Sequence, residues 1–250
     1  MSLQKTDAIV IRLVDFSETS CVVTLFSRDY GKIASLAKGA RRLKGPFDSA
    51  LDLLTVCRIV FLHKSSDALD ILTEAKMVSR FRSAATSLPH LYAAYYIAEL
   101  LDALTEEGDP HEELFETALS AITALDELAD VGATVVRFEL ATLRILGHLP
   151  SVDFCTGCGV EVAGNGRVAF GQLSGGVLCG QCREGQSHVL GVSQEVLHAI
   201  RETSSSDQVT PPLDDQVRGE LRGVMNQYIA HLMGRRPRMQ RFLNAAGQVG

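Results

Sequence analysis

The first eighty residues alternate short apolar runs with polar turns. The runs lie at residues 8–14, 21–26, 33–37, 53–62 and 69–73 and are rich in Val, Ile, Leu and Phe. Short β-branched runs bounded by turn residues are typical of strands. Five strands in about eighty residues match a small closed barrel of the oligonucleotide/oligosaccharide-binding (OB) type, whereas a two-sheet sandwich needs about seven strands in about a hundred residues. We therefore predict an OB-type barrel at residues 1–80.

From residue 81 onward the apolar positions recur at helical spacing. This pattern predicts helices near residues 91–101, 110–128, 135–146, 193–202 and 214–233, the second of them capped by Asp109. The predicted class is therefore α+β and multidomain. A five-stranded OB-type barrel at 1–80 precedes an all-α domain at 81–250, which contains a cysteine-bearing insertion at 151–187.

The insertion carries two C-x-x-C pairs, Cys155 with Cys158 and Cys179 with Cys182, separated by twenty residues. Two residues between thiolates allow one turn to present both sulfurs to a single ion, and four thiolates complete a closed tetrahedral Zn²⁺ site. A redox pair would need only one such motif, and disulfides are rare inside cells. We predict one structural zinc ion. Its role is in folding, because Arg167 and Arg183 are the only basic residues of the insertion.

Composition limits the class of protein. The 250 residues are 46% hydrophobic and 22% charged, which excludes a disordered chain. No apolar stretch approaches the roughly 20 residues that a membrane helix needs, and the start lacks the pattern of a secretory signal. We therefore expect a cytoplasmic protein without a membrane partner.

The net charge of −6 argues against a nucleic-acid ligand only while it is treated as an average. Residues 1–80 hold 12 Lys and Arg against 9 Asp and Glu, residues 81–150 hold 3 against 12, and residues 151–250 hold 9 against 9. Because a polyanion responds to charge within about 8 Å at physiological salt, a basic N-terminal part can bind nucleic acid beside an acidic body. The alternative is that acidic helices only keep the body soluble.

A basic segment lies between the third and fourth predicted strands. Its four cations, Lys38, Arg41, Arg42 and Lys44, fall within seven residues and are interspersed with Gly39 and Gly45. Arginine forks match phosphate oxygens, and glycine allows the backbone to approach them closely. We predict phosphate contacts here, with an ordinary solvated charge run as the alternative.

Two further groups are weaker candidates for nucleic-acid contacts. Arginines at 235, 236, 238 and 241 follow the last predicted helix; they either complement its dipole or extend the phosphate track, and we count Arg236, Arg238 and Arg241 as candidate DNA contacts. Aromatic rings that could stack on bases, but that more often belong to a core, are Phe16, Phe26, Tyr30 and Phe47.

No catalytic constellation is visible. His111-Glu112-Glu113 has the H-x-E form of zinc deaminases, but the residue before Cys155 is Phe154 rather than the proline of that signature. The sequence contains no phosphate-binding P-loop, no H-E-x-x-H and no G-x-S-x-G motif. We therefore predict a non-enzymatic protein with no catalytic residue.

Several motifs together resemble a known family, over residues 5–243. They are Glu18-Thr19-Ser20, Thr24-Leu25-Phe26, Tyr30-Gly31-Lys32, Lys38-Gly39-Ala40-Arg41-Arg42, Tyr95-Tyr96-Ile97-Ala98-Glu99-Leu100-Leu101-Asp102-Ala103-Leu104, Arg137-Phe138-Glu139-Leu140 and the two cysteine pairs. In this order and spacing they resemble the bacterial RecO recombination-mediator family.

The resemblance implies an N-terminal OB barrel and a helical domain with an inserted zinc finger. It also implies binding to single- and double-stranded DNA, strand annealing, partnership with RecR and single-stranded-DNA-binding protein, and help in loading RecA onto gapped DNA. In this sequence the basic barrel loop of the family falls on Lys38, Arg41 and Arg42, and the zinc ligands fall on the four finger cysteines. The resemblance places the protein in the bacterial cytoplasm, at the nucleoid. The strongly acidic helical block of this sequence is a departure from the family, and it argues against DNA contacts by the helical body.

Two functions follow from these observations. The first is a DNA-repair mediator whose barrel holds the phosphate backbone with little sequence preference. The second is a protein–protein adaptor whose helical body is the working surface and whose barrel is only a scaffold.

Overall fold

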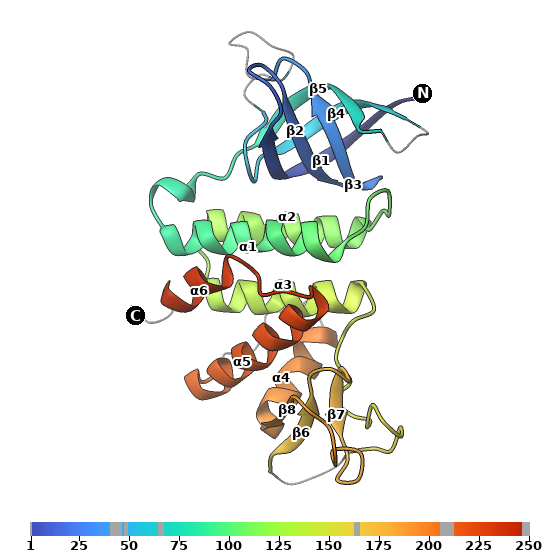
Figure 1. Ribbon diagram of the computed structural model, residues 1–250. Helices are drawn as coiled ribbons and strands as arrows, with labels where there is room; N and C mark the ends of the chain where they lie inside the picture. The colour runs from blue at the N-terminus through green and yellow to red at the C-terminus, as the bar shows by residue number, and fades with distance from the viewer. Residues whose placement is uncertain are drawn as a thin grey trace. The chain divides into compact units, whose positions relative to one another are not determined.

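The protein is described by a computed structural model that covers residues 2–40, 47, 50–64, 68–162, 166–205 and 213–246. These residues form two compact units (Figure 1). Unit 1 contains the described residues of Met1–Val131 and of Arg241–Gly250, and unit 2 contains those of Gly132–Gln240. Helices α1 and α2 thus belong to the same unit as the barrel, and a domain boundary at residue 80 stays a prediction.

Unit 1 begins with the predicted five-stranded barrel. Its strands are β1 (Ser2–Asp15), β2 (Cys21–Ser27), β3 (Gly31–Ala37), β4 (Val56–His63) and β5 (Asp70–Ser79). They pair in the closed order β1-β2-β3-β5-β4, and β4 returns to β1. All pairs are antiparallel except β3 with β5, which confirms an OB-like barrel.

The strand boundaries differ from the sequence prediction most at the start of β1, at the start of β4 and at the end of β5, which extends to Ser79 rather than to residue 73. β1 begins at Ser2 because its polar first residues pair with β4, from Ser2 opposite His63 onward. β4 begins only at Val56 because Leu54 has a positive φ of 65°, so that the apolar Leu53-Leu54 pair forms a turn. Apolar composition alone does not distinguish a buried turn from a strand.

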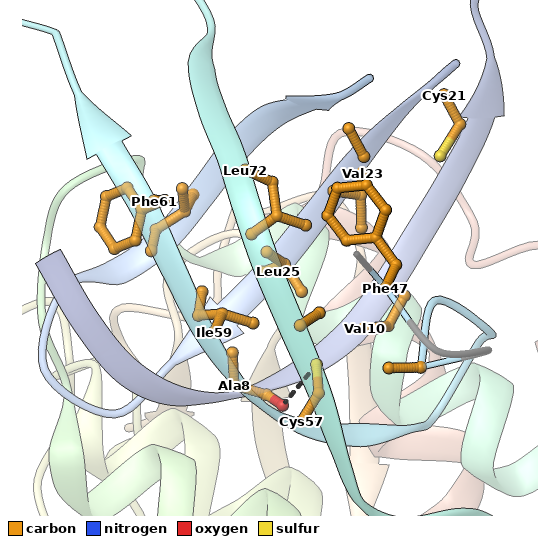
Figure 2. Packing of buried hydrophobic residues seen from close by; sticks show 14 residues of the cluster. Ala8, Val10, Cys21, Val23, Leu25, Phe47, Cys57, Ile59, Phe61 and Leu72 are labelled. Atoms are coloured by element: carbon orange, nitrogen blue, oxygen red, sulfur yellow. Dashed lines mark hydrogen bonds between the residues drawn. The ribbon is translucent and has the colours of Figure 1, made fainter. Parts of the chain in front are cut away.

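Inward-facing side chains of every strand fill the barrel. Figure 2 shows Val10, Leu25, Ile59 and Leu72 meeting at its centre, with Phe47 closing on them from the β3–β4 connection. Both Cys21 and Cys57 are buried in this core.

Two helices of unit 1 pack on the barrel: α1 (Leu88–Leu104), preceded by the short 3-10 helix η1 (Ser83–Ala85), and α2 (Glu112–Asp126). The buried Phe26 ring stacks on Phe115 of α2, with ring centroids 6.5 Å apart. Helix α2 begins after His111 rather than after Asp109, so the predicted Asp109 cap is wrong. The chain returns to unit 1 near α6 (Gln240–Ala246), where Phe242 packs on Tyr92 of α1 at 4.8 Å.

Unit 2 combines helices with a small sheet. Its helices are α3 (Val131–Ile145), α4 (Gln194–Ser205) and α5 (Asp215–Leu232), and its strands β6 (Val168–Gly171), β7 (Gly176–Leu178) and β8 (Val189–Val192) pair in the order β7-β6-β8. A buried ion pair joins α3 to α5, because Arg222 Nη1 donates to both carboxylate oxygens of Glu139 at 2.8 and 2.7 Å. Among the described residues, no helix is both long and apolar enough to span a membrane.

Candidate metal centre and nucleic-acid interface

The four finger cysteines converge in unit 2. Cys155 and Cys158 lie in a tight turn that the Phe154–Glu161 bridge closes, and Cys179 and Cys182 lie in the turn after β7. All four Sγ atoms lie within 4.8 Å of one another. The sulfurs of Cys158 and Cys179 are 3.8 Å apart, which is about the edge of a tetrahedron with 2.3 Å metal–sulfur bonds.

The donor set fits a thiophilic divalent ion. The backbone N–H of Cys179 donates to Cys155 Sγ and lowers the pKa of that thiol to about 6. The pKa of Cys179 is likewise lowered, chiefly by the N–H of Cys182, whereas the sulfurs of Cys179 and Cys158 raise the pKa of Cys182 to about 12. Four adjacent thiolates repel one another, so full ionisation requires a cation among them. The four cysteines could therefore hold a metal ion.

Two glycines permit this close approach. A Cβ on Gly157 would lie 3.0 Å from Cys182 Sγ, and a Cβ on Gly176 would overlap the Ser151 carbonyl, which accepts the N–H of Val177 at 2.9 Å. The basic residue Arg167 is engaged within unit 2, where it contacts Glu220 at 2.6 Å. Arg183, which directly follows Cys182, is exposed, so one basic side chain remains beside the cysteines.

Only part of the predicted basic segment lies in the described chain. Lys38 is exposed directly after β3, and Gly39 adopts a φ of +75° that favours glycine. Arg41, Arg42 and Lys44 lie outside the described residues. The segment starts beside the β1–β2 turn, because the Gly39 N–H donates to Ser20 Oγ at 3.4 Å.

Several barrel cations are engaged within the fold, which no local pattern in the sequence indicates. Arg28 pairs with Glu116 of α2 at 2.5 Å, and Arg58 pairs with Asp7 at 2.8 Å. Lys32 Nζ donates to the carbonyls of Asp102 and Thr105, both at 2.6 Å, at the end of α1. The N-terminal excess of positive charge is therefore not all available to a ligand. Within the described chain, the barrel cations without an ion pair are Lys5, Arg12, Lys38, Lys64 and Lys76.

The C-terminal arginines follow α5 rather than lying in its last turn. The basic residue in the last turn of α5 is His231, and the arginines begin beyond the end of the helix at Leu232. Arg236 and Arg238 are exposed in unit 2, whereas Arg241 is exposed in unit 1 with its guanidinium 4.6 Å from the Phe242 ring centroid. Their contact with DNA stays a prediction.

Three of the four candidate stacking rings are buried or engaged in a hydrogen bond within the barrel. Phe26 and Phe47 are buried, and the half-buried Tyr30 donates its hydroxyl to Gln4 at 2.6 Å. Phe16 is 64% exposed.

The His111 of the H-x-E motif is the N-cap residue of α2, and its Nε2 lies 3.1 Å from the Asp109 carboxylate.

Comparison with known proteins gives matches along almost the whole chain. Residues 1–81 match the family model "Recombination protein O N terminal", and residues 85–241 match "Recombination protein O C terminal". The chain is 43% identical to the DNA repair protein RecO of Rhodopirellula baltica over 94% of this chain and 97% of that protein. It is 32% identical to the RecO of Anaeromyxobacter dehalogenans strain 2CP-C over 100% and 99%, and 31% identical to that of Myxococcus xanthus over 96% and 97%.

Proposed function

Because this chain belongs to the RecO family of DNA repair proteins, we propose that it is a non-enzymatic mediator of DNA repair and recombination. It binds single- and double-stranded DNA through phosphate contacts of the barrel domain, residues 1–80, and promotes strand annealing. The observation that carries the proposal is an OB-like barrel with an exposed cation, Lys38, at the start of a segment rich in arginine and lysine.

The chemistry of annealing follows from charge. Two DNA strands repel each other, and cations that bind their phosphates bring them together while screening that repulsion. In this proposal Lys38, Arg41, Arg42 and Lys44 supply the main contacts, and Arg236, Arg238 and Arg241 extend them. RecR and single-stranded-DNA-binding protein are the proposed protein partners, and RecA is loaded onto gapped DNA as the indirect result. We propose that the protein acts in the bacterial cytoplasm, at the nucleoid.

The test is binding of labelled oligonucleotides by the full chain over a range of salt concentrations. Four phosphate contacts on a single strand give a log–log salt slope of about −3. The Arg41/Arg42/Lys44→Ala variant should bind more weakly, with a slope of about −1. A matched variant, Lys5/Arg12/Lys76→Ala, removes three exposed barrel cations outside the segment and should change the slope less.

Equal salt slopes for the wild type and the segment variant would show that this segment does not contact the phosphates. If the wild type bound no oligonucleotide at all, the adaptor function would be favoured instead.

We propose zinc as the ion of the four-cysteine site, with a structural role. When bound, the ion supplies a cross-link between the two cysteine turns and leaves no open position for water. Freshly purified protein should contain about one zinc per chain, and Cys158→Ser should lose it, whereas Cys21→Ser in the barrel should retain it. Metal analysis that finds well under one zinc per chain would contradict this assignment.

A further inference from the structure

Phe16 is the most exposed phenylalanine described in the chain. It directly follows β1, and 64% of its surface is accessible, compared with 55% for Phe154, the other exposed phenylalanine. The turn that holds it is ordered by hydrogen bonds, since the N–H groups of Phe16 and Ser17 both donate to the Ser20 carbonyl, at 3.0 and 3.1 Å. The fold therefore presents a large apolar ring to solvent on a defined backbone.

The ring continues an outward-facing aliphatic row. Val14 of β1 pairs with Val22 of β2, and Val22 pairs with Leu36 of β3. Their neighbours point inward, as Figure 2 shows for Cys21 and Val23, so these three side chains lie on the outer surface of the barrel. Val14 is exposed and the other two are half-buried.

The same end of the barrel holds the start of the basic segment. Cys21 pairs with Ala37, and Ser20 Oγ accepts the Gly39 N–H, so the Phe16 turn and Lys38 lie side by side. The turn itself also carries Asp15 and Glu18. The turn of the Phe16 ring therefore lies beside Lys38 but carries two carboxylates of its own, which favours contact with a base rather than with a phosphate.

We propose that Phe16, with the aliphatic row Val14, Val22 and Leu36, is a base-stacking surface that selects unpaired DNA. This inference rests on the proposed DNA binding and adds the part of the ligand that this surface contacts. Phosphates bind the basic segment while a base stacks on the Phe16 ring. A duplex keeps its bases stacked on one another, so it gains only the phosphate contacts.

Stacking on an aromatic ring has a distinct signature. Loss of one stacked base weakens single-strand binding by about tenfold, within the range measured for such rings. A phenyl ring binds no phosphate and displaces no counterion from the DNA, so its removal leaves the salt slope unchanged. Phe16→Ala should therefore lower the affinity for an oligo-dT of about 20 nucleotides, leave the duplex affinity within about twofold, and leave both slopes unchanged.

The absence of tryptophan from the sequence permits a direct readout. Phe16→Trp introduces a single tryptophan that keeps an aromatic face at this position, and its emission should be quenched by oligo-dT. Phe154→Trp is the matched control, with a ring of similar exposure near the cysteine site, and its emission should not change.

The inference is overturned if Phe16→Ala binds oligo-dT as well as the wild type does, if it weakens single-strand and duplex binding equally, or if the fluorescence of Phe16→Trp is unaffected by oligo-dT. In each case the wild type still binds DNA and the proposed function stands. If the wild type bound no oligonucleotide, the proposed DNA-binding function itself would be contradicted.

Discussion

The ion pair between Glu139 and Arg222 shows how one charged residue can control the stability of unit 2. The Glu139 side chain is fully buried and that of Arg222 is 18% exposed, and Arg222 Nη2 also donates to Asn226 at 2.9 Å. Removal of one member of a buried pair leaves the other charge uncompensated in a poorly solvated place.

Glu139→Ala should therefore lower the free energy of unfolding by about 3 kcal/mol, measured by urea denaturation. Arg218→Ala on α5 is the control. Its ion pair with Asp215 is exposed, so this variant should lower the free energy of unfolding by about 0.5 kcal/mol or less. Similar losses in the two variants would show that the Glu139 pair is effectively solvated.

Cys57 is a second residue whose environment gives a measurable property. Burial in the barrel, assisted by the Asp7 carboxylate, raises its thiol pKa to about 12, and the thiol donates to the Ala8 carbonyl at 3.7 Å (Figure 2). At pH 8 only about one folded molecule in 10,000 has the thiolate there. Iodoacetamide should therefore leave Cys57 unmodified in the folded protein and alkylate it in urea, as mass spectrometry of peptides would show.

The pH dependence of stability follows from the same shift. The folded state holds the thiol proton more tightly than the unfolded chain, whose thiol has a pKa of about 8.5. The contribution of Cys57 is therefore fully present below about pH 8.5 and is lost as the pH rises toward 12. Cys57→Ala should remove this part of the alkaline loss of stability, and an unchanged alkaline slope would contradict the assignment.

At the scale of elements, the approach of the α1–α2 connection to β3 depends on Gly31. The Gly31 φ is +63°, and a Cβ there would overlap the Asp109 carbonyl. The backbone carbonyl of Lys32 accepts the N–H of Gly108 at 3.0 Å in the same contact.

Gly31→Ala should cost more than 2 kcal/mol of unfolding free energy, since it adds a clash to the strain of a left-handed backbone. Gly108→Ala is matched in φ, at +74°, but a Cβ there meets nothing within 4 Å, so it should cost about 1 kcal/mol. Thermal or urea unfolding measures both, and equal losses would show that the connection moves to accept the methyl group.

The elements also show what the sequence could and could not predict. The five strands and the cysteine site were predictable because alternation and C-x-x-C spacing are local signals. The turn at Leu54 and the start of α2 were not, because an apolar pair resembles a strand and Asp-Pro resembles a cap. The engagement of Lys32 by the carbonyl groups at the end of α1 is a tertiary contact with no local signal.

At the scale of the whole molecule, charge counted along the chain is not the same as charge offered to a ligand. Lys32 is half-buried and serves the C-terminal end of α1, where a cation stabilises unpaired carbonyl groups. Lys32→Met should lower the unfolding free energy by about 2 kcal/mol and leave the salt slope of DNA binding unchanged. Lys76→Met, at an exposed position on β5, should leave stability nearly unchanged. A shallower salt slope for Lys32→Met would show that this lysine reaches DNA.

The packing of Phe242 on Tyr92 has a consequence for the order in which the protein folds. The two rings belong to unit 1, yet all of unit 2 lies between them in the chain. A ribosome releases the barrel strands and α1 first, but Tyr92 meets its partner only after unit 2 has been synthesised. Contacts between such distant positions form late, because a long loop must close first. The unit made first is therefore the unit completed last, and until then the α1 surface around Tyr92 is open to other proteins in the cell.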